Sequence, residues 1–207
     1  MSKTRFYLIR HGETVWNKEK RYQGWTDIEL SENGKKQAEL LGKRFQNLKI
    51  DAVYSSPLKR AIKTAQPVAD IANLSVITDE HFKEINFGAW EGGTVEELTQ
   101  QYGKEFSDFF ESPFEYPFPG EGSFAHVAER SLEGFQLLLE KHRGQSVVIV
   151  SHGGLLRVLI IKLMGMDISF YRKTWLNNTS ITTIDMIDGS PLLYTLNDSA
   201  HIEMMKK

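Results

Sequence analysis

The chain alternates between short apolar runs and longer segments in which apolar residues recur every three or four positions. The short runs, at 6–9, 51–55, 75–78 and 146–151, have the length of strands, and the run SVVIVS at 146–151 is typical of a central strand buried on both faces. The longer segments have the period of amphipathic helices. This alternation predicts a mostly parallel sheet with helices on both faces.

Start and stop signals set the limits of the predicted helices. Ser31 and Ser123 precede helical patterns as N-caps, and Ser56-Pro57 combines a capping hydroxyl with proline at the first helical position. Gly144 ends the helix that Ser123 begins. The segments expected to be helical are 31–48, 56–72, 94–102, 105–111, 123–143 and the one from 153 to about 164, with a short turn within 13–19.

Two further features complete the predicted fold. Strands at 180–187 and 192–196, joined by 188–191, indicate a hairpin that adds an antiparallel edge. Residues 80–122 hold glycines, prolines and aromatics without a sustained period, which indicates an excursion over one end of the sheet. We therefore expect an α/β protein with a single domain over residues 1–207. Its architecture would be a three-layer α/β/α sandwich with a mostly parallel central sheet, an antiparallel edge and a cap-like insertion at about 80–122.

Composition narrows the class of protein. The formal net charge of −2 argues against a nucleic-acid partner or an anionic membrane. The sequence contains no cysteine, so a thiolate nucleophile, a disulfide framework and thiolate-bound zinc are excluded. It shows neither an N-terminal signal peptide nor an apolar run of transmembrane length, so we expect a cytoplasmic protein with no membrane partner. Whether the protein forms a homodimer stays open.

Charged side chains stand where three predicted elements reach one edge of the sheet. Arg10 and His11 follow the first strand, and His152 follows the central strand and precedes a helix. Arg60 lies in the first turn of the helix after the second strand. Because parallel strands end at a common edge, we expect these four residues to meet there. Two arginines, two histidines and free amides at a helix N-terminus suit a phosphate group.

Two of these residues also have an ordinary structural interpretation. Alone, Arg60 would be a solvated helix charge, and His152 a polar cap on the following helix. Their joint placement at strand ends favours the phosphate site. Two histidines also suggest a metal site, but neither has a ligand partner three or four residues further on, and two arginines would repel a cation. We therefore predict no metal and no cofactor.

Four segments, taken together, resemble the histidine phosphatase superfamily, which includes the phosphoglycerate mutases. They are RHGET (10–14), SSPLKRAIKTA (55–65), EINFGAWEG (84–92) and VSHGG (150–154). The resemblance covers nearly the whole chain and implies a phosphoglycerate mutase-like fold and a small phosphorylated substrate. It implies that His11 is the nucleophile that becomes phosphohistidine and that Glu84 protonates the leaving group. The other residues implied to bind the substrate are Arg10, Asn17, Gln23, Gly24, Arg60, His152 and Gly153, and Arg10, Arg60 and His152 among them are also predicted to act in catalysis.

The chemistry of phosphoryl transfer supports these roles independently. The transfer needs in-line placement and spread positive charge. A neutral imidazole is a competent nucleophile, and neighbouring arginines disfavour its protonation. A carboxylic acid must then protonate the departing alkoxide and later accept a proton from water. Glu84 and Glu91 are the candidates in EINFGAWEG; the resemblance favours Glu84, and we expect Glu91 to fix the loop.

Phosphatase and mutase are the main alternatives within this family. Mutases of the family carry a stretch resembling NERHYG and further arginines in the insertion, whereas this chain has KEINFGAWEG, and residues 94–122 contain Lys104 and no arginine. The insertion instead holds aromatic residues that either pack it or form a partly apolar lid: Phe106, Phe109, Phe110, Phe114, Tyr116 and Phe118. One departure is PGEGS (119–123), because the family commonly has Glu directly before Ser, which puts a role of Glu121 in doubt.

We therefore expect a metal-independent phosphomonoesterase that acts through a phosphohistidine intermediate on small phosphorylated metabolites. The alternatives are a phosphoglycerate mutase, an α-ribazole phosphatase, and a phosphate-binding module without activity.

Overall fold

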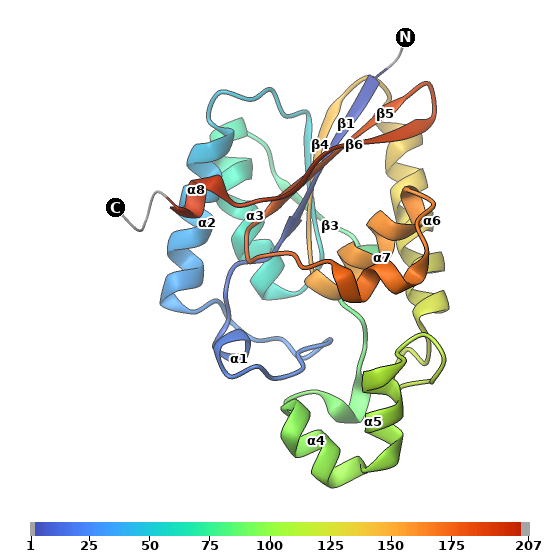
Figure 1. Ribbon diagram of the computed structural model, residues 1–207. Helices are drawn as coiled ribbons and strands as arrows, with labels where there is room; N and C mark the ends of the chain where they lie inside the picture. Colours follow the sequence, from blue (N-terminus) through green and yellow to red (C-terminus); the bar gives the residue numbers. More distant parts are fainter. Residues whose placement is uncertain (1–2, 204–207) are drawn as a thin grey trace.

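The computed structural model describes residues 3–203 and places a six-stranded sheet between two layers of helices (Figure 1). The strand order is β3-β2-β4-β1-β5-β6. The four strands from β3 to β1 are parallel, β5 runs antiparallel to β1, and β6 runs antiparallel to β5. The three-layer sandwich with an antiparallel edge is thus confirmed. In chain order the strands are β1 (Lys3–Arg10), β2 (Ala52–Ser55), β3 (Val76–Thr78), β4 (Ser146–Ser151), β5 (Ile181–Ile187) and β6 (Ser190–Asp198).

Long helices cover both faces of the sheet (Figure 1). One face carries α2 (Glu32–Phe45) and α3 (Lys59–Ala72), and the other carries α6 (Phe124–Lys141) and α7 (Gly153–Leu163). The shorter helices are α1 (Val15–Lys18), α4 (Val95–Tyr102), α5 (Lys104–Glu111) and α8 (Ala200–Glu203), with 3-10 turns at Glu80–Phe82, Gly88–Trp90 and Ile168–Lys173. Within residues 3–203, no helix has both the length and the apolar character needed to cross a membrane.

The apolar run of β1 supplies both halves of the core, because successive side chains on a strand point to opposite faces. Phe6 and Leu8 belong to the cluster under α6 and α7, where the rings of Phe6 and Phe135 lie 4.4 Å apart. Tyr7 and Ile9 belong to the cluster under α2 and α3. The valines and isoleucine of β4 are fully buried in the same alternating way. Burial on both faces holds the ends of β1 and β4 in fixed positions, and these ends carry the candidate site.

Two local predictions were wrong. Helix α3 begins at Lys59 with Leu58 as its N-cap, so Ser56 and Pro57 precede the helix; the Oγ of Ser56 accepts from the amide of Leu58 at 3.3 Å and lies 2.7 Å from Nε2 of His152. The terminal hairpin turns through Asp188-Gly189 alone, both with positive φ, so that Pro191 lies within β6. Proline is tolerated there because β6 is an edge strand whose outer side needs no hydrogen-bond donor.

The segment 80–122 lies beyond the end of the sheet and carries α4 and α5 (Figure 1). Its aromatic residues mostly pack among themselves: Phe106, Phe109 and Phe118 are buried. The Phe106 and Phe109 rings both contact the buried Trp90 ring at about 5 Å. Phe110 is half exposed and lines the cavity described below together with Phe109. The insertion is therefore both a packed unit and a wall of that cavity.

Candidate active site

A cavity of about 900 Å³ opens at the carboxyl ends of β1 and β4. Arg60 and His152 are fully buried and are not part of its lining; their bonds to Gly24 and to each other place them behind the wall. The structure thus brings together the residues that the sequence placed at one edge. The predicted residues that line the cavity directly are Arg10, His11, Asn17, Gln23, Gly24, Glu84 and Gly153.

His11 lies at the floor of the cavity with its orientation fixed. Its Nδ1 atom lies 2.7 Å from the carbonyl oxygen of Gly12. A carbonyl can only accept, so Nδ1 carries the proton and Nε2 keeps its lone pair. Burial, followed by the charges of Arg60 and Arg10, holds the pKa of His11 well below its usual value. The arrangement supplies a neutral imidazole with a free nucleophilic nitrogen.

His152 and Arg60 form a coupled pair behind the floor. The Nε of Arg60 donates to Nδ1 of His152 over 3.3 Å, so the proton of that ring is on Nε2, which donates to Oγ of Ser56. Arg60 also donates to the carbonyl oxygens of Thr26 and Gly24, at 2.8 and 2.6 Å. Burial lowers the pKa of Arg60 to about 10 and holds that of His152 well below its usual value.

Both ring nitrogens of His152 therefore have protein partners. One of these partners is the guanidinium of Arg60, and the other is the hydroxyl of Ser56. Direct contact between His152 and a phosphoryl oxygen stays a prediction.

Arg10 supplies an unpaired donor. Its Nη1 donates to the carbonyl oxygen of Leu176 at 2.6 Å, and its guanidinium lies over the ring of Trp175. The Nε atom of Arg10 is buried and has no hydrogen-bond partner among the described residues. Burial lowers the pKa of Arg10 to about 10, so the side chain is charged at neutral pH. A buried, charged and unsatisfied donor is costly unless a ligand completes it, and an anionic oxygen would do so.

Glu84 occupies the N-terminus of α7. Its carboxylate accepts from the amides of Leu155 and Gly154, at 2.9 and 3.2 Å, and from the amide of Ile85 at 3.0 Å. The prediction that the first amides of this helix are free for phosphate is therefore wrong for Gly154 and Leu155. These bonds fix the carboxyl group of Glu84 in the lining of the cavity.

The loop at 23–26 is tied to the Glu84 segment by Glu91. Its carboxylate accepts from the amides of Trp25 and Thr26, at 2.8 and 2.7 Å, and from the Thr26 hydroxyl. Gly24 has φ +50°, and a Cβ atom there would lie 1.9 Å from Oε1 of Glu91, so only glycine fits. The Oε1 of Gln23 accepts from the Thr14 hydroxyl, so the amino group of Gln23 is the part available to the cavity that this residue lines. Glu91 has the loop-fixing contacts expected from the sequence.

Asn178 is a site residue that the sequence reasoning missed. Its Nδ2 donates to the carbonyl oxygen of His11 and to Oδ1 of Asn17, at 3.0 and 3.2 Å. Oδ1 of Asn17 also accepts from the amide of Thr14, so the Asn17 amino group is the part left for a ligand. A signal was available: the start of an antiparallel strand lies at the same edge as the ends of its parallel neighbours, and Asn178 stands just before β5.

Cations at the cavity mouth were also missed. Arg157 of α7 donates to the carbonyl oxygens of Tyr171 and Thr174 and stacks 3.6 Å over the Tyr171 ring. The other cations of the mouth come from the segments after α1 and around the last 3-10 turn, and are Lys20, Arg21, Arg172 and Lys173. Among residues 3–203, no group of three or more His, Asp or Glu side chains is placed to hold a metal ion.

Comparisons with known proteins agree with this architecture. Phosphoserine phosphatase 1 of Hydrogenobacter thermophilus is 37% identical over 195 residues, which cover 94% of this chain and 92% of that protein. The crystal structure of phosphoserine phosphatase from Entamoeba histolytica in complex with 3-phosphoglyceric acid superposes with a TM-score of 0.87 at 37% identity, and covers 96% of this chain and 99% of the other. Bacillus stearothermophilus YhfR gives a TM-score of 0.90 at 36% identity over 96% and 99% of the two chains.

The family described as the histidine phosphatase superfamily, branch 1, matches residues 6–199. This range includes every residue of the candidate site. The chain belongs to the histidine phosphatase superfamily, branch 1.

Proposed function

We propose that this chain is a metal-independent phosphomonoesterase that works through a phosphohistidine on His11. The observation that carries the proposal is the pairing of a free Nε2 on a buried, neutral His11 with the unsatisfied Nε of Arg10 in the same cavity. A nucleophile and an anion-seeking donor are what the first step of phosphoryl transfer needs. In this proposal residues 1–207 form one domain, and the insertion at 80–122 caps the site.

The reaction would proceed in two steps. In the first, Nε2 of His11 attacks phosphorus, the bond from phosphorus to the ester oxygen breaks, and Glu84 donates its proton to that oxygen. In the second, water attacks the phosphohistidine, Glu84 takes a proton from it, and the bond from phosphorus to Nε2 breaks. The buried arginines would offset the charge on the phosphoryl oxygens in both steps.

For the substrate, we propose a small alcohol phosphate that carries a carboxylate, with phosphoserine as the representative. Two observations support this class. Two of the relatives named above are phosphoserine phosphatases, and one of these two was crystallised with 3-phosphoglyceric acid. In addition, the mouth of the cavity carries cations beyond those at its floor, and one of them, Arg157, donates to the carbonyl oxygen of Gly153. A second anionic group on the substrate would complement them.

Release of phosphate in the presence of EDTA tests the proposal. The purified chain is assayed with p-nitrophenyl phosphate, phosphoserine and 3-phosphoglycerate, with and without EDTA. We expect turnover of the first two, undiminished by EDTA, because arginines supply the charge that a metal ion supplies elsewhere. Loss of activity with EDTA that a divalent ion restores would contradict metal independence. Binding of phosphate without turnover would identify a binding module, and conversion of 3-phosphoglycerate to its isomer would identify a mutase.

A further inference from the structure

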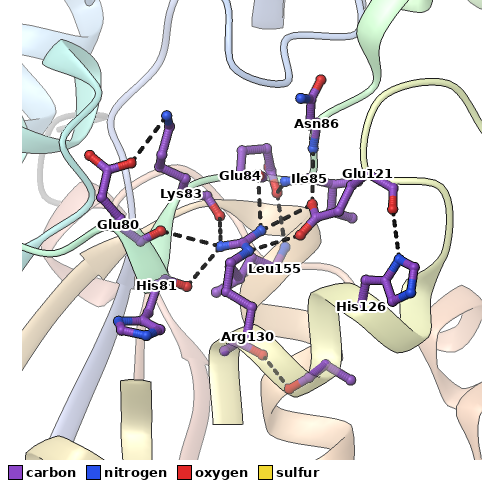
Figure 2. Close-up of polar contacts among 12 residues, drawn as sticks. Glu80, His81, Lys83, Glu84, Ile85, Asn86, Glu121, His126, Arg130 and Leu155 are labelled. Carbon is purple, nitrogen blue, oxygen red and sulfur yellow. Dashed lines mark hydrogen bonds and ion pairs between the residues drawn. The ribbon is translucent and has the colours of Figure 1, made fainter. Parts of the chain in front are cut away.

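The guanidinium group of Arg130, on α6, lies beneath the backbone that carries Glu84 (Figure 2). Its Nη1 donates to the carbonyl oxygens of His81 and Lys83, at 2.8 and 3.0 Å. Its Nη2 lies 3.4 Å from the carbonyl oxygen of Glu84 itself. A single side chain of the long helix thus contacts three backbone carbonyl groups of the segment that leads into Glu84.

Glu121 completes the arrangement from the other side of the insertion. Its two carboxylate oxygens accept from Nε and Nη2 of Arg130 at 2.8 and 3.0 Å, in the paired geometry that favours arginine over lysine (Figure 2). Oε2 of Glu121 also accepts from the amide of Asn86, and the Glu121 amide donates to the Asn86 carbonyl, at 3.2 and 3.0 Å. Although PGEGS departs from the family pattern, Glu121 therefore still makes specific contacts.

The bonds of this pair fall on both sides of Glu84, at Lys83 and at Asn86. The segment around them belongs to no strand or helix, since Glu84 lies between the two 3-10 turns. Its position is therefore set by side chains that hold its carbonyls and amides. The pair is also shielded from water, with side-chain exposures of 20% for Arg130 and 12% for Glu121. Because the pair is partly buried, removing one side chain would leave the charge of the other unpaired, which is destabilising.

We propose that Arg130 and Glu121 are positioning residues for Glu84: they hold its backbone so that its carboxyl group faces the leaving-group oxygen. This inference rests on the proposed role of Glu84 as the acid. A displacement of about 1 Å can cost on the order of 10²-fold in a positioned step. The loss should therefore appear where the acid is needed, in esters whose leaving oxygen is basic, and should be small where the leaving group departs unaided.

The test is the single-turnover rate of enzyme phosphorylation with two substrates, phosphoserine and p-nitrophenyl phosphate. For Arg130→Met we expect the phosphoserine rate to fall about tenfold or more and the p-nitrophenyl phosphate rate less than about threefold. Arg130→Lys keeps the positive charge but not the planar guanidinium, so its phosphoserine rate should fall by less than that of Arg130→Met. In a Glu84→Gln background, Arg130→Met should cause no further change, because residues that act through one group are not additive.

Arg5→Met is the matched control. Arg5 makes the same paired contact with Asp185, at 2.6 and 2.7 Å, with side-chain exposures of 24% and 4%. It lies toward the amino end of β1, away from the cavity. We expect Arg5→Met to lower stability without changing the ratio of the two rates. Circular dichroism and thermal unfolding check each variant, and Glu121→Gln replaces Arg130→Met if the latter does not fold.

An equal fall for both substrates, or a further fall in the Glu84→Gln background, would overturn the inference and leave a general structural role for the pair. These results are distinct from failure of the proposed function. If the wild type releases no phosphate, the proposed function fails. If Glu84→Gln lowers both rates equally, the acid assignment fails, and this inference fails with it.

Discussion

The floor and the mouth of the cavity carry positive charge in different ways. At the floor, His11, Arg60 and His152 are nearly or fully buried, and the histidines and Arg60 are tied to one another or to backbone carbonyls. At the mouth, Lys20, Arg172 and Lys173 are exposed to water. Charges at the floor are weakly screened, whereas those at the mouth are screened by water and salt.

We expect the buried floor to determine the chemical step and the exposed mouth to determine which substrate binds. Burial lowers the pKa of Arg10 and Arg60 to about 10 and depresses the pKa of both histidines, so the environment at the floor decides which atoms carry protons. At the mouth, replacing a cation should change the free energy little, because water already solvates these exposed charges. Substitutions at the floor should therefore change rates by orders of magnitude, and substitutions at the mouth should change selectivity modestly.

The largest effect is expected from His11→Ala, which removes the proposed nucleophile. Phosphatase turnover should fall by at least about 10⁴-fold. The fold should survive, because His11 lies at the end of β1 and not within the apolar clusters. Steady-state assay and circular dichroism check both parts. A variant that keeps more than a few per cent of activity would contradict the assignment of the nucleophile.

The next effect is expected from Glu84→Gln. Protonation of the leaving group matters most for a basic alkoxide, so phosphorylation by phosphoserine in a single turnover should slow by roughly 10²–10⁴-fold, and phosphorylation by p-nitrophenyl phosphate much less. Single turnovers are needed because the same carboxyl group is proposed to activate water in the second step. If both substrates slow equally, Glu84 is not the leaving-group acid, and Glu91 is tested in its place.

A smaller effect is expected at the mouth from Arg157→Met. For phosphoserine, kcat/KM should fall about tenfold, the order expected for one charge-assisted hydrogen bond. For glycerol phosphate, which has no carboxylate, it should fall less than about threefold. Arg143→Met is the control, since Arg143 is exposed near the start of β4, at the opposite edge of the sheet. Equal losses for both substrates would mean that Arg157 supports the loop at Tyr171 and Thr174 without reading the substrate.

The smallest effect concerns stability against pH. Folded His11 and His152 stay neutral to a lower pH than they do in the unfolded chain. Below a pH of about 6.5 the unfolded chain therefore binds more protons, and stability is lost as the pH falls. Each histidine should lower the free energy of unfolding by about 1 kcal/mol between pH 6.5 and 5.5. Urea unfolding at both pH values should show a weaker dependence for His152→Gln than for the wild type; parallel curves would contradict burial of a neutral ring.

Much of the floor could be predicted from the sequence, because its residues stand at the ends of apolar runs. Arg10 ends β1, and His11 and His152 follow β1 and β4 directly; a parallel sheet brings such ends to one edge whatever the details of packing. Helix starts were less certain. Ser56 is of the residue type that caps helices, yet its hydroxyl also contacts the His152 ring. That contact joins two segments far apart in the sequence, so only the tertiary structure reveals it.

The amino-acid sequence by itself determined the layered fold, the edge at which the site lies and the residues of its floor, since these depend on local periodicity and strand direction. The tertiary structure decided the rest. It brought Asn178 to His11, Arg157 to the mouth, Glu84 to the N-terminus of α7, and Arg130 and Glu121 to the backbone around Glu84. Contacts of this kind join positions far apart in the chain through loops without a period, and so leave no pattern along it that could be read in advance.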